Sequence, residues 1–137
     1  MEERRAAPEA IGNLRLIKTE RSVSGKHIPL SFERPYLILI EGIARFRLAG
    51  IIEFGNPIIR VAISPANNDN SNGSEQIVNW DIRDNWQIEG TDVTLRAFFS
   101  KKNLNRNKVG NSIHKVVFII SAPRDTIIKT EPPNINT

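Results

Sequence analysis

Cysteine is absent from the sequence, and its absence excludes several classes of protein. Without a thiol, the chain has no disulfide scaffold, no thiolate nucleophile, no Cys-ligated zinc and no iron–sulfur cluster. Histidine is also scarce, because His27 and His114 are the two examples and a three-histidine metal site needs more. We therefore expect no cofactor and no metal ion.

Apolar runs of membrane-spanning length are lacking too. The run from Tyr36 to Ile40 is interrupted by Glu41, far short of the ~20 residues that a membrane-spanning helix needs. Residues 1–10 are rich in charge and no apolar segment follows them, so no signal peptide is recognisable. We expect an intracellular protein, located in the cytoplasm or within an assembled particle.

Motifs that carry catalysis are missing as well. The sequence has no Gly-x-Ser-x-Gly, no Walker A loop, no Gly-x-Gly-x-x-Gly and no EF-hand pattern. Both histidines fall in strand-like segments, where a structural role is the simpler interpretation. The carboxylates of Asp81 and Asp84 have a spacing that sets no geometry on a strand or turn. These absences favour a protein that is not an enzyme, and a small hydrolase or isomerase using a histidine with a carboxylate is the remaining enzymatic hypothesis.

The chain has the length and composition of one folded domain. It has 137 residues, of which 39% are hydrophobic and 25% charged, and domains most often have ~100–150 residues. We expect a flexible N-terminal arm at residues 1–12, a β domain at 13–130 and a flexible C-terminal tail at 131–137. In the tail, Pro132 and Pro133 disfavour both a helix and a central strand.

Alternation of apolar and polar residues predicts strands through the middle of the chain. From Tyr36 to Leu48 the even positions are apolar or glycine, while the odd positions change from leucine to charged residues. This predicts one long strand, covered on both faces at its start and on one at its end, with a bulge or bend at Gly42. The apolar run in His114–Ser121 predicts a central strand that is buried on both faces. Further strands are expected at 14–16, 27–32, 51–63 with a turn or kink, 77–82, 86–99 with a break, and 126–129. About 7–8 short strands indicate an all-β, antiparallel sandwich or barrel, with jelly-roll, immunoglobulin-like and barrel topologies all open.

Positive charge is concentrated late in the chain. The formal net charge is +4, but residues 93–124 contain seven Lys or Arg and no Asp or Glu. Residues 64–92 contain six Asp or Glu and Arg83 as their one cation. The centre of the basic segment, residues 100–111, is polar and Asn-rich, which predicts a loop between two strands.

Clustered cations without neighbouring acids suit an anionic partner. Lys and Arg bind a phosphate backbone by releasing its condensed counterions, and Asn amides add hydrogen bonds to phosphates or bases. We predict a site for RNA, single-stranded DNA or another polyanion at Lys101, Lys102, Arg106 and Lys108, extended by Arg96, Lys115, Arg45 and Arg47. The competing interpretation is a solvated hairpin tip that keeps a sheet edge soluble. An acidic protein surface and then a membrane surface are further alternatives.

The opposite charges of segments 64–92 and 93–124 leave two arrangements open. If the segments lie on different faces, copies of the chain can stack head to tail or pair symmetrically. If the segments are neighbours, they neutralise each other within one chain. The sequence alone favours neither arrangement.

The aromatic residues have two interpretations. Trp80 and Trp86 are more often core or rim residues in a small β domain than platforms for stacked bases. Phe98 is out of phase with the apolar positions Leu95 and Ala97. It is a contact residue if its side of the strand faces solvent, and a core residue if a second layer covers it.

Together these features predict a non-enzymatic structural or assembly subunit, of the general character of a virion coat or matrix protein. It would self-associate as a homo-oligomer and contact nucleic acid or another polyanion through its basic loop. The alternative is a monomeric β-sandwich module that binds a protein, sugar or lipid headgroup at loops 65–74 or 100–111. The sequence indicates no small-molecule substrate.

Overall fold

The computed structural model describes residues 9–11, 14–55, 57–66, 75–102 and 113–133. For 9–11, 52–55, 100–102 and 113–115 the description covers the backbone alone. These residues form strands and turns without a helix, so the described part of the chain has no helix that could cross a membrane.

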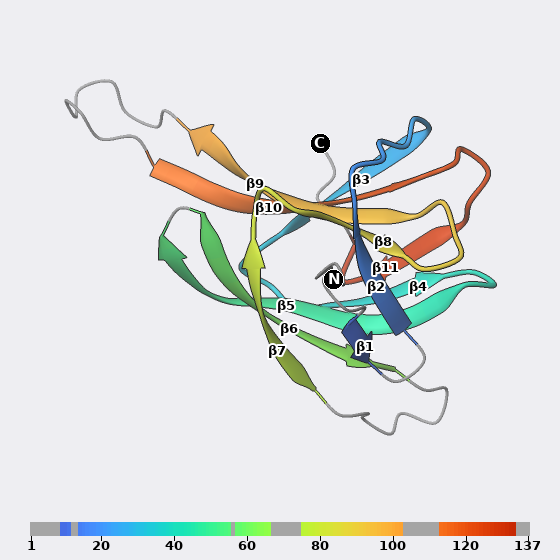
Figure 1. The fold of residues 1–137 in the computed structure, drawn as a ribbon, viewed down its shortest axis with the longest axis horizontal. Coiled ribbons are helices and arrows are strands. Elements are labelled where there is room, and N and C mark those ends of the chain that lie inside the picture. Colours follow the sequence, from blue (N-terminus) through green and yellow to red (C-terminus); the bar gives the residue numbers. More distant parts are fainter. Residues whose placement is uncertain (1–8, 12–13, 56, 67–74, 103–112, 134–137) are drawn as a thin grey trace, which may run out of the picture.

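Two antiparallel sheets pack face to face as a sandwich (Figure 1). The first sheet has the strand order β1 (Glu9–Ile11), β2 (Leu14–Thr19), β8 (Asn85–Ile88), β9 (Thr94–Lys102), β10 (Ile113–Ala122) and β3 (Lys26–Ser31). The second has the order β11 (Ile128–Glu131), β4 (Tyr36–Ile40), β5 (Ala44–Gly55), β6 (Ile58–Pro65) and β7 (Gln76–Asp81). The predicted all-β antiparallel sandwich is confirmed.

The strand count differs from the prediction of 7–8, because the described residues form eleven strands. One reason is that Tyr36–Leu48 is a hairpin of β4 and β5 and not one long strand. Gly42 lies in the connecting turn with a φ of 75°, and the N–H of Ile43 donates to the carbonyl of Ile40 at 2.9 Å. The turn leaves Ile40 and Ala44 an even number of residues apart, so the apolar alternation continues in phase through it.

Strand β5 also joins segments that the sequence suggested were separate. It runs to Gly55 and pairs with β6, with shifts of register between Gly50 and Ile52 and between Glu53 and Gly55. Such bulges bend a strand without ending it. The expected turn or kink near residue 56 is therefore the connection between β5 and β6.

Strand β10 is buried on one face only, which corrects the prediction of burial on both. Val116, Phe118 and Ile120 are buried, whereas Val117 and Ile119 are half-buried. β10 lies between β9 and the edge strand β3, so its second face is the outer face of the sandwich.

The ends of the domain differ from the predicted boundaries by a few residues. β1 falls inside the predicted arm and pairs antiparallel with β2. β11 ends at Glu131, the first residue of the predicted tail. Residues 1–8 and 134–137, to which the prediction of mobile ends also applies, lie outside the described residues.

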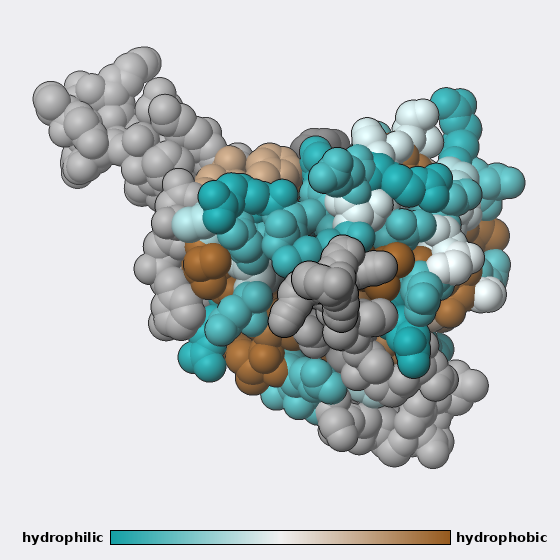
Figure 2. All heavy atoms as spheres, in the orientation of Figure 1, coloured by the Kyte–Doolittle hydropathy of each residue, from teal (hydrophilic) through white to brown (hydrophobic). Residues whose placement is uncertain are grey.

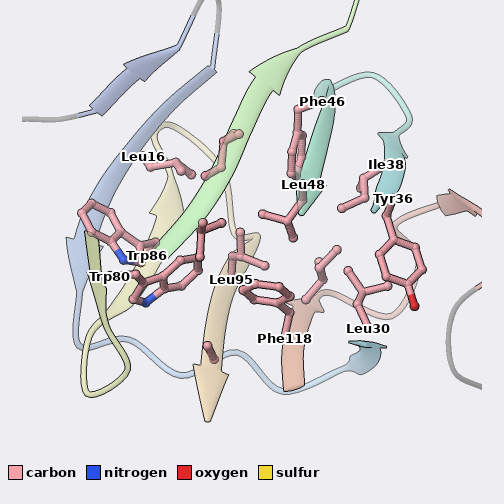
Figure 3. Close-up of a cluster of buried hydrophobic side chains, with 14 of the residues drawn as sticks. Leu16, Leu30, Tyr36, Ile38, Phe46, Leu48, Trp80, Trp86, Leu95 and Phe118 are labelled. Carbon is pink, nitrogen blue, oxygen red and sulfur yellow. The ribbon is translucent and has the colours of Figure 1, made fainter. Parts of the chain in front are cut away.

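Aromatic side chains from both sheets meet in the core (Figure 3). Trp80 of β7 contacts Trp86 of β8 edge to face, with ring centroids 6.2 Å apart. Trp80 also lies 5.6 Å from Phe118 of β10, which in turn lies 5.7 Å from Phe32. Trp80 and Trp86 are buried, so they are core residues and not exposed platforms for bases.

Gly50 is required where β5 passes Phe32. A Cβ atom built on Gly50 would lie 2.3 Å from Cδ1 of the Phe32 ring. That ring is buried and packs against Phe118 in a tilted arrangement, so it has little freedom to withdraw.

We expect Gly50→Ala to lower the free energy of unfolding by about 1–3 kcal/mol, because the added methyl group overpacks the core. In a Phe32→Ala background the loss should be smaller, since alanine lacks the Cγ, Cδ1 and Cε1 atoms that the added methyl group would meet. Urea unfolding of the four chains measures this coupling. An equal loss in both backgrounds would show that the contact with Phe32 is not the cause.

Candidate nucleic-acid interface

The basic segment, residues 93–124, contains the paired strands β9 and β10. The two strands pair in unbroken register from Thr94 opposite Ser121 to Lys102 opposite Ile113. In Figure 1 this end of the hairpin, drawn in orange at the upper left, lies at the periphery of the sandwich. Residues 100–102 of the predicted loop belong to β9, and its remaining residues, 103–111, lie outside the described residues.

Three predicted site residues share the last rungs of this hairpin. Lys101 pairs with His114, and Lys115 pairs with Ser100, while Lys102 ends β9. The backbone register thus brings Lys101, Lys102 and Lys115 within a few residues of one another across two strands. Arg106 and Lys108 lie outside the described residues.

Arg96 and Phe98 form an exposed pair on the outer face of the same strand. The Arg96 guanidinium carbon lies 5.9 Å from the centroid of the Phe98 ring, within reach of a cation–π contact. Phe98 is 39% exposed, and the sequence had left open whether this side of β9 faces solvent. Lys102 lies an even number of residues after Arg96 and Phe98, so its position is on the same face of β9.

The outer face beside Phe98 is moderately apolar. Phe98 pairs with Val117 and Arg96 pairs with Ile119, and both partners on β10 are half-buried. The other large exposed hydrophobic side chains of the described residues are Ile43, Ile51, Ile77 and Ile127. Figure 2 shows separate brown areas among teal on one face of the molecule. An aromatic ring with a cation on one side and β-branched side chains on the other can accept a stacked base.

Arg45 and Arg47 do not extend this patch, contrary to expectation. Both lie on the outer face of β5, in the other sheet, where they pair with Leu39 and Leu37 of β4. The outer faces of the two sheets point in opposite directions. Both arginines are half-buried and have interactions of their own.

A hollow beside Arg47 carries charges of both signs. Its volume is about 280 Å³, and small side chains such as Ala49, Ala62 and Ser64 line it together with Arg47, Glu75 and Glu131. Two carboxylates so close to the arginine make this side of the sandwich a poor surface for a polyanion.

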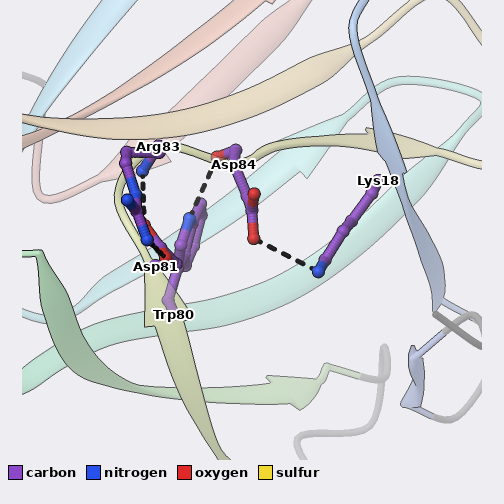
Figure 4. Close-up of polar contacts among 5 residues, drawn as sticks. All are labelled: Lys18, Trp80, Asp81, Arg83 and Asp84. Carbon is purple, nitrogen blue, oxygen red and sulfur yellow. Dashed lines mark hydrogen bonds and ion pairs between the residues drawn. The ribbon is translucent and has the colours of Figure 1, made fainter.

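Four acids of the segment 64–92 have ion-pair partners outside the segment 93–124. Glu89 pairs with Arg15 at 3.8 Å, Asp84 with Lys18 at 3.3 Å and Asp92 with Arg21 at 3.1 Å, all three cations lying on or just after β2. Asp81 pairs with Arg83 in the turn after β7 (Figure 4).

The cations of the basic segment are left without carboxylate partners as far as the structure describes them. Of the described ion pairs, none includes Arg96 or Arg124. Segments 64–92 and 93–124 therefore do not neutralise each other through any described pair. Arg96, whose side chain the structure describes, therefore stays available to an external anion.

Other arrangements of reactive side chains are sparse. His27 Nδ1 lies 2.7 Å from the Ser121 hydroxyl on the outer face of the first sheet. Within the part of the chain that the structure covers, no three His, Asp or Glu side chains gather as a metal site. The side chain of His114 lies outside the described atoms.

No protein-family model, curated protein or solved structure matches this chain. The site is therefore characterised by its own geometry and charge.

The turn after β7 holds one carboxylate strongly in its charged form. The Arg83 guanidinium donates from Nε to Asp81 at 2.9 Å, and the Arg83 backbone N–H donates to the same oxygen at 2.9 Å. These bonds lower the pKa of Asp81 from 3.8 to about 2. The bond from the Arg83 side chain has the larger effect, and the bond from the Arg83 backbone the next. A lowered carboxyl pKa adds stability above pH ~4 that is lost as the pH falls toward ~2.

We expect Asp81→Asn to reduce stability at neutral pH by less than about 1 kcal/mol, because the ion pair is exposed on its arginine side. The asparagine oxygen can keep the bonds from the Arg83 backbone and Nε, whereas its amide nitrogen cannot accept from Arg83 Nη2, so the variant removes the charge and that one bond. Urea unfolding between pH 4 and pH 2 should then depend less on pH than in the wild type. Parallel pH profiles would contradict the assigned role of the Asp81 carboxylate.

Proposed function

We propose that this protein is a non-enzymatic, self-associating structural subunit that binds single-stranded nucleic acid through the β9–β10 hairpin. The observation that supports it most is the segment 93–124, which carries seven cations and no acid and whose described cations have no carboxylate partner. Phosphate is the anion that such a set of amines and guanidinium groups binds most readily, through release of counterions.

Phe98 favours a single strand over a duplex as the ligand. In a duplex the bases are stacked on one another, whereas a single strand presents faces that can stack on an aromatic ring. Phe98 is exposed, and Arg96 beside it supplies a charge for the adjoining phosphate. The combination of cationic track and aromatic ring is typical of sequence-tolerant single-strand binding.

Neutralising Lys101, Lys102, Arg106 and Lys108 to Gln should weaken binding of a single-stranded RNA oligonucleotide at low salt. If each residue contacts one phosphate, the slope of log affinity against log salt should fall in magnitude by up to about 2.8. Fluorescence anisotropy across a salt series measures both quantities.

The matched control neutralises four exposed cations elsewhere, Lys18, Arg21, Arg34 and Lys129, and changes the net charge equally. It should keep most of the wild-type salt slope. An equal effect of both variants would show that net charge and not the hairpin drives binding. Wild-type protein without affinity for RNA or DNA at low salt would refute the proposal.

Phe98→Ala should weaken binding by about 5- to 150-fold at constant salt, the equivalent of ~1–3 kcal/mol for one stacked base. The salt slope should not change, because no phosphate contact is lost. Ile127→Ala, at another exposed hydrophobic position, is the control and should bind as the wild type does. Unaltered affinity of Phe98→Ala would exclude stacking on this ring.

A further inference from the structure

The four edges of the two sheets are protected to different degrees. An exposed edge strand invites pairing with another chain unless proline, lysine, a bulge or short length prevents it. Edge strand β1 has three residues, β3 contains Pro29, and β11 has four residues and is followed by Pro132. Each of these edges therefore carries one recognised form of protection.

Strand β7 lacks these forms of protection. It has six residues, contains no Pro, Lys or Arg, and pairs with β6 without a bulge. Ile77 and Asn79 on its outer face are exposed, and Asp81 at its end is its one charged residue. In the described part of the chain, β7 pairs with β6 alone.

The free backbone groups of β7 are identified by the ladder to β6. The N–H of Ile82 donates to the carbonyl of Pro57 at 2.9 Å, at the end of a register that places Trp80 opposite Ile59 and Val78 opposite Val61. In an antiparallel pair, residues two apart direct their backbone groups to the same neighbour. Val78 and Trp80 therefore bond to β6, and the positions between them face the open edge.

Three residues thus present backbone groups at the open edge. Ile77 and Asn79 direct both N–H and C=O outward, and Asp81 directs its N–H outward. The Asp81 carbonyl already accepts the N–H of Asp84 at 2.8 Å within the turn.

We propose that β7 pairs antiparallel with β7 of a second copy of this chain, about a two-fold axis at Asn79. Asn79 would exchange both backbone bonds with Asn79 of the other copy, and each Asp81 N–H would donate to the carbonyl of Ile77 across the axis. The two five-stranded sheets would become one continuous sheet. This inference rests on the self-association that is part of the proposed function.

The register and the charges both suit a second copy. A two-fold at Asn79 pairs positions of the same parity, so the outer faces of both sheets stay on the same side. Glu75, just before β7 of one copy, then lies near the turn after β7 that carries Arg83 of the other copy, at both ends of the pair. Asp81 faces Ile77, so no like charges meet.

The test measures the molar mass of nuclease-treated full-length protein by light scattering over a wide concentration range. We expect the wild type to dimerise reversibly and Asn79→Pro to remain monomeric, because proline removes the N–H at the axis. Asn79→Thr keeps that N–H and should dimerise. Because the N–H of residue 79 points away from β6, Asn79→Pro should fold, which circular dichroism checks.

A cysteine at position 79 tests the axis without relying on proline. The chain has no cysteine, so Asn79→Cys supplies its one thiol, and residues directly opposite in a hydrogen-bonded pair lie at a distance that a disulfide can span. Mild oxidation should yield a covalent dimer, whereas Ile127→Cys, at a distant exposed position, should yield far less.

Three results would overturn the proposal: a wild type that stays monomeric, dimers of Asn79→Pro as strong as those of the wild type, or no preferential cross-link at position 79. Nucleic-acid binding is read separately, by anisotropy on the same samples. An Asn79→Pro monomer that still binds RNA supports both proposals, and a dimer without affinity for RNA refutes the proposed function alone.

Discussion

Aromatic contact between the two sheets is the constraint on which the rest of the structure depends. Phe32 and Phe118 belong to one side of the sandwich, Trp80 to the other, and Trp86 closes the group from β8. Large buried rings dominate the energetics of a small core because each removes a large apolar area from water. Once the rings are buried, the inward face of each strand that carries them is fixed. The side chains on the opposite face of these strands then point to solvent.

The charge distribution follows from that choice of faces. Leu95 and Ala97 point inward, so Arg96 and Phe98 must point outward on β9. The pairing of β2 with β8 then carries Arg15 and Lys18 toward the acids that follow β7 and β8. One sheet therefore holds both a neutralised region around β2 and a basic hairpin whose described cations have no acid partner.

Short-range alternation was sufficient to predict the fold class, because apolar and polar residues alternate along a strand that has one buried face. It was not sufficient for Tyr36–Leu48, because the three-residue turn between Ile40 and Ala44 leaves the apolar residues at even positions in both strands. The hairpin therefore has the same alternation as one long strand. Sheet membership has no local signal either, so Arg45 and Arg47 were expected near the hairpin although they lie on the opposite outer face. The partners of Glu89 and Asp92 lie more than seventy residues away in the sequence, and such long-range pairs follow from strand order alone.

The burial of both tryptophans has a practical consequence for spectroscopy. Trp80 and Trp86 are each other's neighbours in the core, and the Trp80 indole N–H donates to the carbonyl of Asp84 at 3.3 Å. Their emission should be blue-shifted in the native state and move to the red when water enters between the sheets. The outward-facing ring of Phe98 absorbs little at the wavelengths that excite indole. Intrinsic tryptophan fluorescence therefore reports whether the sandwich is intact, and it gives no signal from the β9–β10 hairpin.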